Sequence, residues 1–116
     1  ILRFVEVNKM TIITTEMINS ARVYANSQTY LRINTLLSIS PNDIRIEIHP
    51  YNDKYKETIS LEYKGNWYCD IELRDDDCLH ITNYSLEEID ELNCAMLFTF
   101  ANCFMNKLEE LLKKEL

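Results

Sequence analysis

The sequence has one glycine among its 116 residues, and this scarcity excludes several kinds of site. An average protein contains about 7% glycine. A glycine-rich phosphate loop and the G-x-G-x-x-G turn of dinucleotide-binding folds each need several glycines close together, and Gly65 stands alone. Nucleotide-binding enzymes of these two classes are therefore excluded.

Long apolar runs are also absent. The longest dense apolar stretch, Cys94–Met105, is interrupted by two polar residues and is shorter than the ~20 residues that a membrane-spanning helix needs. The segment Ile1–Ile13 lacks the basic start and continuous apolar core of a secretory signal peptide. Met10 is a candidate native start, with Ile1–Lys9 as an added piece or a short strand. We expect a cytoplasmic protein.

The four cysteines form no C-x-x-C pair, which argues against a zinc ribbon or a redox motif. Cys94 and Cys103 are separated by about 180° around a predicted helix, so they cannot share a metal ion. Cys78 and His80 form a C-x-H pair on a predicted strand, but side chains at this spacing are too far apart for a direct hydrogen bond. We predict reduced thiols, no bound metal and no cofactor.

The composition is that of a globular protein, with 47% apolar and 27% charged residues. At this length, residues 1–116 should form a single domain with its own core. The abundance of Ile, Asn, Lys and Tyr is typical of AT-rich genomes, which favours a low-GC bacterium or its phage as the source.

The N-terminal third predicts a helix that begins near Thr15. Its apolar residues fall at helical spacing: Met17, Ile18, Ala21, Tyr24 and Ala25. The segment Tyr30–Ile39 fits either a continuation of this helix or a strand. The sequence Pro41-Asn42-Asp43 then predicts a turn.

The next forty residues alternate between apolar and polar, which predicts an antiparallel meander with one buried face. The inward positions are Ile44, Ile46, Ile48, Ile59, Leu61, Tyr63, Trp67, Cys69, Ile71, Leu73, Leu79 and Ile81. The outward positions include Glu47, His49, Glu62, Tyr68, Asp70, Glu72, Arg74, His80 and Thr82.

Burial on one face also predicts the register of the strands. A three-residue loop at 64–66 places Tyr63 opposite Trp67 and Ile59 opposite Ile71, whereas a two-residue Gly65-Asn66 turn would make the apolar faces disagree. A three-residue tip at 75–77 likewise places Leu73 opposite Leu79.

A long C-terminal helix is predicted from Ser85 to about Lys113. Ser85 and Glu88 have the spacing of a capping box, and Tyr84 and Ile89 that of a hydrophobic staple. The middle of this helix is apolar nearly all round and needs cover on more than one side. The sheet supplies one side; the first helix or a second copy supplies the other, and we expect a homodimer through this helix.

These elements predict an α+β fold. One antiparallel sheet of four to five strands is packed on one face by an N-terminal helix and a long C-terminal helix. The order of elements is loosely similar to that of small acidic secretion chaperones, although no sequence motif accompanies the similarity.

Negative charge is concentrated in the middle of the chain. The formal net charge is −7, and the stretch from Asp43 to Glu91 alone holds fourteen acidic residues against five basic ones. A field of one sign attracts cationic partners and repels phosphate backbones. We predict a partner-binding surface formed by Asp70, Glu72, Asp75, Asp76, Asp77, Glu87, Glu88, Asp90 and Glu91.

The sequence leaves three functions open. The leading hypothesis is a non-enzymatic acidic inhibitor that blocks a basic, nucleic-acid-handling protein, as phage anti-restriction, anti-CRISPR and nuclease-immunity proteins do. The alternative is a homodimeric adaptor or secretion-chaperone-like protein that binds through an apolar helical surface. An enzyme using Asp70, Glu72 or His80 is the third, because two carboxylates ~7 Å apart on one strand suit acid–base chemistry. Direct nucleic-acid binding is disfavoured, since no basic stripe is present.

Overall fold

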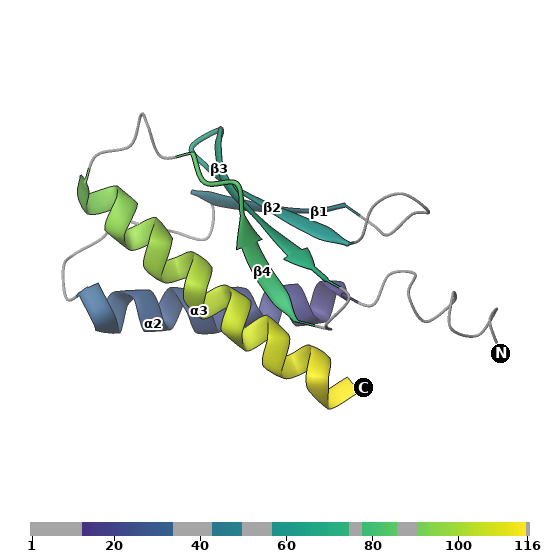
Figure 1. Cartoon of the computed structure of the whole chain (residues 1–116). Helices are drawn as coiled ribbons and strands as arrows, with labels where there is room; N and C mark the ends of the chain where they lie inside the picture. Colours follow the sequence, from purple (N-terminus) through teal and green to yellow (C-terminus); the bar gives the residue numbers. More distant parts are fainter. Residues whose placement is uncertain (1–12, 34–42, 50–56, 75–77, 86–90, 116) are drawn as a thin grey trace, which may run out of the picture.

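A computed structural model of the chain describes residues 13–33, 43–49, 57–74, 78–85 and 91–115. Two helices and four strands follow one another in the order α2 (Thr15–Ile33), β1 (Ile44–His49), β2 (Thr58–Tyr63), β3 (Asn66–Leu73), β4 (Leu79–Thr82) and α3 (Glu91–Glu115). The strands form an antiparallel meander in the order β1-β2-β3-β4, and both helices lie on one side of it (Figure 1). The predicted α+β fold is confirmed.

The helix α2 begins where the sequence predicts. The Thr14 hydroxyl accepts a hydrogen bond from the Met17 amide at 3.2 Å, so Thr14 is the N-cap. Ile13 and Ile18 flank this cap and are both buried, which is the arrangement of a hydrophobic staple. The helix continues through Ile33, and the rest of the ambiguous segment lies outside the described residues.

A buried carboxylate ties the start of α2 to the sheet. Glu57, just before β2, accepts a hydrogen bond from the Ile13 amide at 3.1 Å, and its own carbonyl accepts one from Leu73. The Glu57 side chain is only 2% exposed. The contact fixes where the chain enters α2 relative to the second and third strands.

The helix α3 supplies most of the core. Met96, Leu97, Phe100, Phe104 and Leu108 are all essentially buried between the sheet and α2. The cover that the apolar sequence requires therefore comes, for these residues, from the first helix rather than from a second copy.

One face of this apolar segment stays open. Phe98 is 48% exposed. The described part of the helix begins at Glu91 and continues to Glu115, two residues beyond the predicted end. Ser85 precedes it as non-helical chain, and the predicted capping box and staple involve residues outside the described part.

The register of the sheet confirms two predictions and corrects one. Ile59 pairs with Ile71, and Leu73 pairs with Leu79, as burial on one face requires. The predicted 64–66 loop is wrong, because Tyr63 pairs with Asn66 and the turn contains only Lys64 and Gly65.

The correct turn has its own physical signature. Lys64 and Gly65 both have positive φ angles, 50° and 84°, which two-residue turns of the I′ type require. Such a turn alone would pair the apolar positions of β2 with the polar positions of β3. A β-bulge next to the turn, at Leu61 and Glu62 of β2, changes this pairing. The extra residue on β3 restores the phase, so that Leu61 pairs with Cys69.

The bulge reverses the expected orientation of two aromatic residues. Tyr68 was expected on the outer face and Trp67 in the core. Instead Tyr68 is fully buried, and Trp67 is 38% exposed on the face with Glu62, its cross-strand neighbour. The Tyr68 carbonyl accepts a hydrogen bond from the Ser85 amide at 2.9 Å, which holds the chain after β4 against the bulge.

Candidate functional site

The face of the sheet turned away from the helices, here called the outer face, is the candidate site. None of the described elements covers it (Figure 1). Cross-strand pairing arranges its side chains in three rows. These rows are Arg45–Glu62–Trp67, Glu47–Ser60–Asp70–Thr82 and His49–Thr58–Glu72–His80. Four carboxylates and one guanidinium group stand in the rows.

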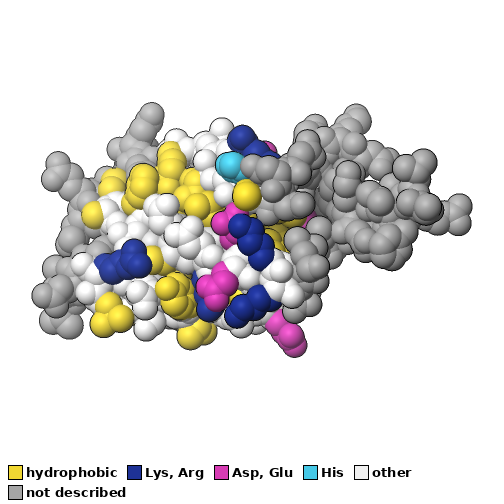
Figure 2. Space-filling model, turned by 60° about the horizontal axis from the view of Figure 1, so that its bottom comes forward, with side chains coloured by type: hydrophobic (Ala, Val, Ile, Leu, Met, Phe, Trp, Pro, Cys, Tyr) yellow, Lys and Arg dark blue, Asp and Glu magenta, His cyan; other side chains and the backbone are white. Residues whose placement is uncertain are grey.

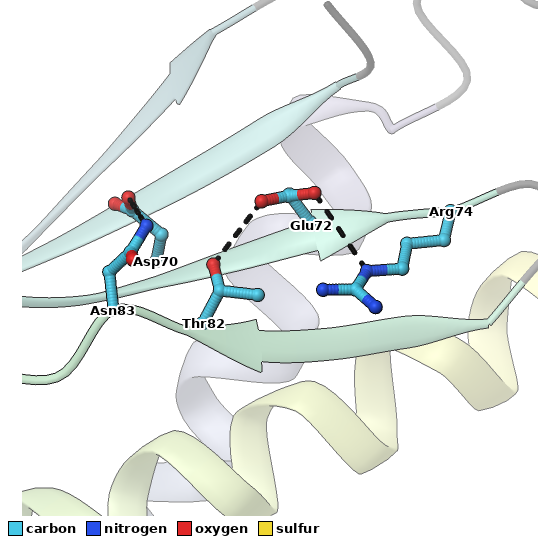
Figure 3. Close-up of polar contacts among 5 residues, drawn as sticks. All are labelled: Asp70, Glu72, Arg74, Thr82 and Asn83. Carbon is cyan, nitrogen blue, oxygen red and sulfur yellow. Dashed lines mark hydrogen bonds and ion pairs between the residues drawn. The ribbon is translucent and has the colours of Figure 1, made fainter.

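Asp70 is the centre of the outer face. Its carboxylate accepts hydrogen bonds from the Trp67 indole nitrogen at 2.8 Å, from the Ser60 hydroxyl at 2.9 Å and from the Asn83 amide at 3.5 Å. Figure 3 shows Asp70 and Asn83 turned toward each other, on the side of the sheet away from the helices. The site residue Asp70 therefore holds an exposed tryptophan in a fixed orientation.

Glu72 forms a second polar group two residues further along β3. One carboxylate oxygen accepts a hydrogen bond from the Thr82 hydroxyl at 3.3 Å, and the other lies 3.8 Å from the Arg74 guanidinium (Figure 3). Both ionic side chains are substantially exposed, so the pair contributes little to stability. Together, the contacts with Thr82 and Arg74 hold the Glu72 carboxylate in one orientation.

His49 extends the network toward β1. Its Nε2 lies 3.1 Å from the Ser60 hydroxyl. Because Ser60 donates its only hydroxyl proton to Asp70, the His49 Nε2 must carry a proton and donate to the Ser60 oxygen. A serine whose proton points at a carboxylate, rather than at a neutral imidazole, is not arranged as a nucleophile. The network is suited to fixing side chains.

Three ionisable residues on the helical side of the sheet, Cys69, Tyr68 and Tyr84, are uncharged at physiological pH. Burial, with a smaller contribution from the Asp70 charge, raises the pKa of the Cys69 thiol to about 12. Burial also raises the pKa of Tyr84 to about 12 and that of Tyr68 well above its usual value. All three groups are therefore neutral at physiological pH, and Cys69 faces the core as predicted.

The other predicted site residues fall in two groups. Asp75, Asp76, Asp77, Glu87, Glu88 and Asp90 lie outside the described residues, and Glu91 opens α3 with its side chain undescribed. Cys78 is half-buried before β4, and His80 stands in the row of Glu72. Within the described ranges, no group of three or more His, Cys, Asp or Glu side chains is arranged to hold a metal ion.

Trp67 is the residue that sequence reasoning missed. Simple alternation assigned it to the core. The signal that could have found it is the Lys64-Gly65 turn, since a two-residue turn with a bulge also reconciles both apolar faces. That combination exposes Trp67 and buries Tyr68.

The helical side of the molecule carries a different kind of surface. Tyr84 and Phe98 stack with ring centroids 4.9 Å apart, and they are 39% and 48% exposed. On α2, Val23 and Leu31 are 70% and 71% exposed. Figure 2, which brings the lower side of Figure 1 forward, shows hydrophobic side chains in patches separated by charged ones.

A shallow depression of about 290 Å³ lies between the start of α2 and the end of α3. Its lining residues are Thr14, Glu16, Met17, Ser20, Leu111 and Lys114. The depression is open to solvent, and its lining includes one acidic and one basic side chain, Glu16 and Lys114.

Comparison with known protein families, with curated proteins and with solved structures finds no match in any of the three. Neither described helix has the length and apolar character needed to cross a membrane. The geometry of the outer face and the charge of the sequence therefore carry the functional argument.

Proposed function

We propose that the protein is a non-enzymatic inhibitor that binds a basic, nucleic-acid-handling partner in the cytoplasm through the outer face of its sheet. The observation that carries this proposal is Trp67, an exposed tryptophan whose indole is locked by Asp70 on a face that no described element covers.

The physics of interfaces supports this role for Trp67. Tryptophan is among the residues that most often dominate binding energy, particularly where the surrounding contacts with the partner exclude water from it. A side chain already held in one orientation loses little conformational entropy on binding. The hydrogen bond from Trp67 to Asp70 supplies this preorganisation.

The charge of the outer face supports a basic partner. Glu47, Glu62, Asp70 and Glu72 stand in its rows. The sequence adds the acidic segments 75–77 and 87–91 on either side of β4. These carboxylates would occupy the sites at which a nucleic-acid-binding partner holds the phosphates of its nucleic acid. They would also raise the rate of encounter with a cationic surface.

The test compares capture of proteins from a nuclease-treated bacterial lysate by the full chain and by two matched variants. Trp67→Ala removes the exposed aromatic on the outer face, and Phe98→Ala removes one on the helical side. We expect capture of a basic protein that is lost with Trp67→Ala, kept with Phe98→Ala and weakened by salt. The captured protein should then lose its nucleic-acid binding when the full chain is added in stoichiometric amount.

Two results would contradict the proposal. One is capture that is unchanged by Trp67→Ala. The other is a captured protein that binds nucleic acid equally well with and without this chain. Circular dichroism of both variants shows whether the fold is retained, so that lost binding is not confused with lost structure.

A homodimeric adaptor that binds through an apolar helical surface is the second candidate. The stacked Tyr84–Phe98 pair and the exposed apolar residues of α2 favour it. An interface of this kind resists salt because it depends on apolar burial. Capture that is lost with Phe98→Ala, kept with Trp67→Ala and insensitive to salt would select this function instead.

A further inference from the structure

The two edges of the sheet differ in how they are protected. At the β4 edge, the Leu79 amide donates a hydrogen bond to the Glu109 carboxylate of α3 at 3.0 Å, and α3 lies against this strand (Figure 1). At the β1 edge, β2 pairs with one side of β1, and within the described part of the chain no strand pairs with the opposite side. An open edge of this kind is a template for pairing with another strand.

The direction of the β1 amides follows from one hydrogen bond. The Lys64 amide donates to the Asp43 carbonyl at 3.1 Å, and these two residues continue the β1–β2 register. Bonded and non-bonded pairs alternate in an antiparallel ladder. Arg45, Glu47 and His49 therefore bond to β2, whereas the amides and carbonyls at positions 44, 46 and 48 point to the open edge.

The side chains of β1 are complementary to themselves. If two copies of the strand run antiparallel about Ile46, Ile46 meets its own copy and Ile44 meets Ile48 of the second copy. On the outer face, Arg45 then lies directly opposite Glu47 of the second copy, twice per dimer. The isoleucines at 44, 46 and 48 are the residues whose backbone groups point to the edge, so the same alignment also satisfies the hydrogen bonds.

Other alignments of the two strands fail. Centring on Arg45 or on Glu47 places a like charge opposite itself, which is destabilising. If one strand shifts by one residue relative to the other, the isoleucines of the second copy lie on the outer face of the first. Three devices that protect sheet edges are missing from Ile44–His49, which contains no proline, no inward charge and no bulge in its pairing with β2. The two charges that the strand does carry, Arg45 and Glu47, attract each other in the alignment about Ile46.

We propose that the β1 strands of two copies of this chain pair antiparallel about Ile46 and form one continuous eight-stranded sheet. All four helices then lie on one side, and the two outer faces form one surface on the other. Pairing would cover Ile46 and Ile48, which are only partly buried at the margin of the core. This inference does not depend on the proposed function, because the pairing uses the edge of β1 and not Trp67. Glu47 belongs to both surfaces, and its role here is tested by association of the chain with itself and not by capture of a partner.

The decisive experiment uses two charge reversals and their mixture. In Glu47→Arg alone, two arginines face each other across the interface; in Arg45→Glu alone, two glutamates do. When the two variants are mixed, each arginine again faces a glutamate. We expect a wild-type dimer by sedimentation equilibrium in the micromolar range, about tenfold weaker association of each variant alone, and restored association in the mixture.

Amide hydrogen exchange on the full wild-type chain provides an independent readout. The amides of Ile44, Ile46 and Ile48 should be protected at high protein concentration and should exchange faster on dilution. Those of Arg45 and Glu47, bonded to β2, should show no such dependence.

Three results would overturn the proposal. They are a wild-type monomer throughout the micromolar range, a mixture that associates no better than its components, and edge amides whose protection is independent of concentration. The last would mean that another segment of the same chain covers β1. None of these results bears on capture of a basic partner, so the two proposals fail separately.

Discussion

Trp67 and Tyr68 are adjacent in the sequence and lie on opposite sides of the sheet, and each has a distinct energetic consequence. Trp67 satisfies its indole N–H with Asp70. The Tyr68 hydroxyl is buried without a hydrogen-bond partner among the described residues. A buried hydroxyl without a partner costs about 1–3 kcal/mol. The aromatic ring of Tyr68 is thus required in the core, but its oxygen is not.

The first prediction is that Tyr68→Phe raises the free energy of unfolding by about 1 kcal/mol, because the desolvation cost of the hydroxyl disappears. Tyr63→Phe is the matched control. The Tyr63 hydroxyl donates to Asn93 at 3.5 Å, so its removal should leave stability unchanged or slightly lower. Urea unfolding of both variants measures the difference. A clear loss of stability in Tyr68→Phe would show that the hydroxyl has a partner.

The second prediction concerns alkaline pH. Burial raises the pKa of Cys69 to about 12, above the usual value near 9, so the folded state keeps the proton that the unfolded chain releases. The stabilising effect of this group is complete below pH 9 and is lost as pH rises toward 12. Tyr84, with its pKa raised to about 12, acts in the same direction over the upper part of that range.

The free energy of unfolding should therefore fall above pH 9, with Cys69 contributing a slope of at most about 1.4 kcal/mol per pH unit. Urea unfolding at several pH values on both sides of pH 9, the ordinary pKa of a cysteine thiol, tests this. Cys69→Ala lowers stability at every pH through the lost side chain but should show a shallower alkaline slope. Equal slopes in the two proteins would contradict the assignment.

At the level of elements, the hairpin β2–β3 shows what the sequence can and cannot specify. Alternating residues were enough to predict four strands, the Ile59–Ile71 pair and the buried face. They could not separate a three-residue loop from a two-residue turn followed by a bulge, because both keep the apolar faces in phase. The positive φ angles of Lys64 and Gly65 decide between them.

The candidate site was predictable only in part for the same reason. Asp70 and Glu72 were assigned to the outer face by alternation, and they lie there. Trp67 was assigned to the core, since the bulge that exposes it leaves no trace in the apolar pattern. Its bond to Asp70 is a contact between positions three apart, which strict alternation does not place on one face.

The third prediction tests the turn. Gly65→Ala should lower the free energy of unfolding by about 1 kcal/mol, because its φ of 84° disfavours an L side chain. No atom lies within 4 Å of the added Cβ, so the cost is conformational rather than steric. Lys64→Asn should raise stability by about 0.5 kcal/mol, since asparagine tolerates positive φ better than lysine.

These two substitutions form a matched pair on adjacent residues. A three-residue loop would not require positive φ at both positions, so the two opposite effects are specific to the two-residue turn. If both variants had the same stability as the parent protein in thermal or urea unfolding, the I′ turn would be incorrect.

For the whole molecule, charge and the layered fold divide the surface in two. The helices cover one side of the sheet and carry the exposed side chains of Val23, Leu31 and Phe98, while the outer face carries carboxylates around Trp67. The stretch with fourteen acidic and five basic residues contains all four strands. A partner attracted by this field should approach the sheet before the helices.

The last prediction concerns the rate of that approach. Asp75→Lys together with Asp77→Lys changes the charge of the segment between β3 and β4, where the Arg74 amide bonds to the Cys78 carbonyl at 3.1 Å. Charges at the rim of an interface act mainly through steering, so association with the captured basic partner should slow and become less sensitive to salt. The free energy of unfolding should change by no more than about 0.5 kcal/mol.

The matched control reverses the same amount of charge on the helices, with Glu16→Lys and Glu110→Lys. Both variants change the net charge equally. The helical pair also removes the ion pairs of Glu110 with Lys107 and Lys114, so the free energy of unfolding of both variants is measured alongside. Stopped-flow association at several salt concentrations should show a smaller effect for the helical pair. Equal slowing in both variants would mean that net charge alone governs encounter. Unchanged association in the Asp75 and Asp77 variant would move the interface to the apolar residues of the helical side.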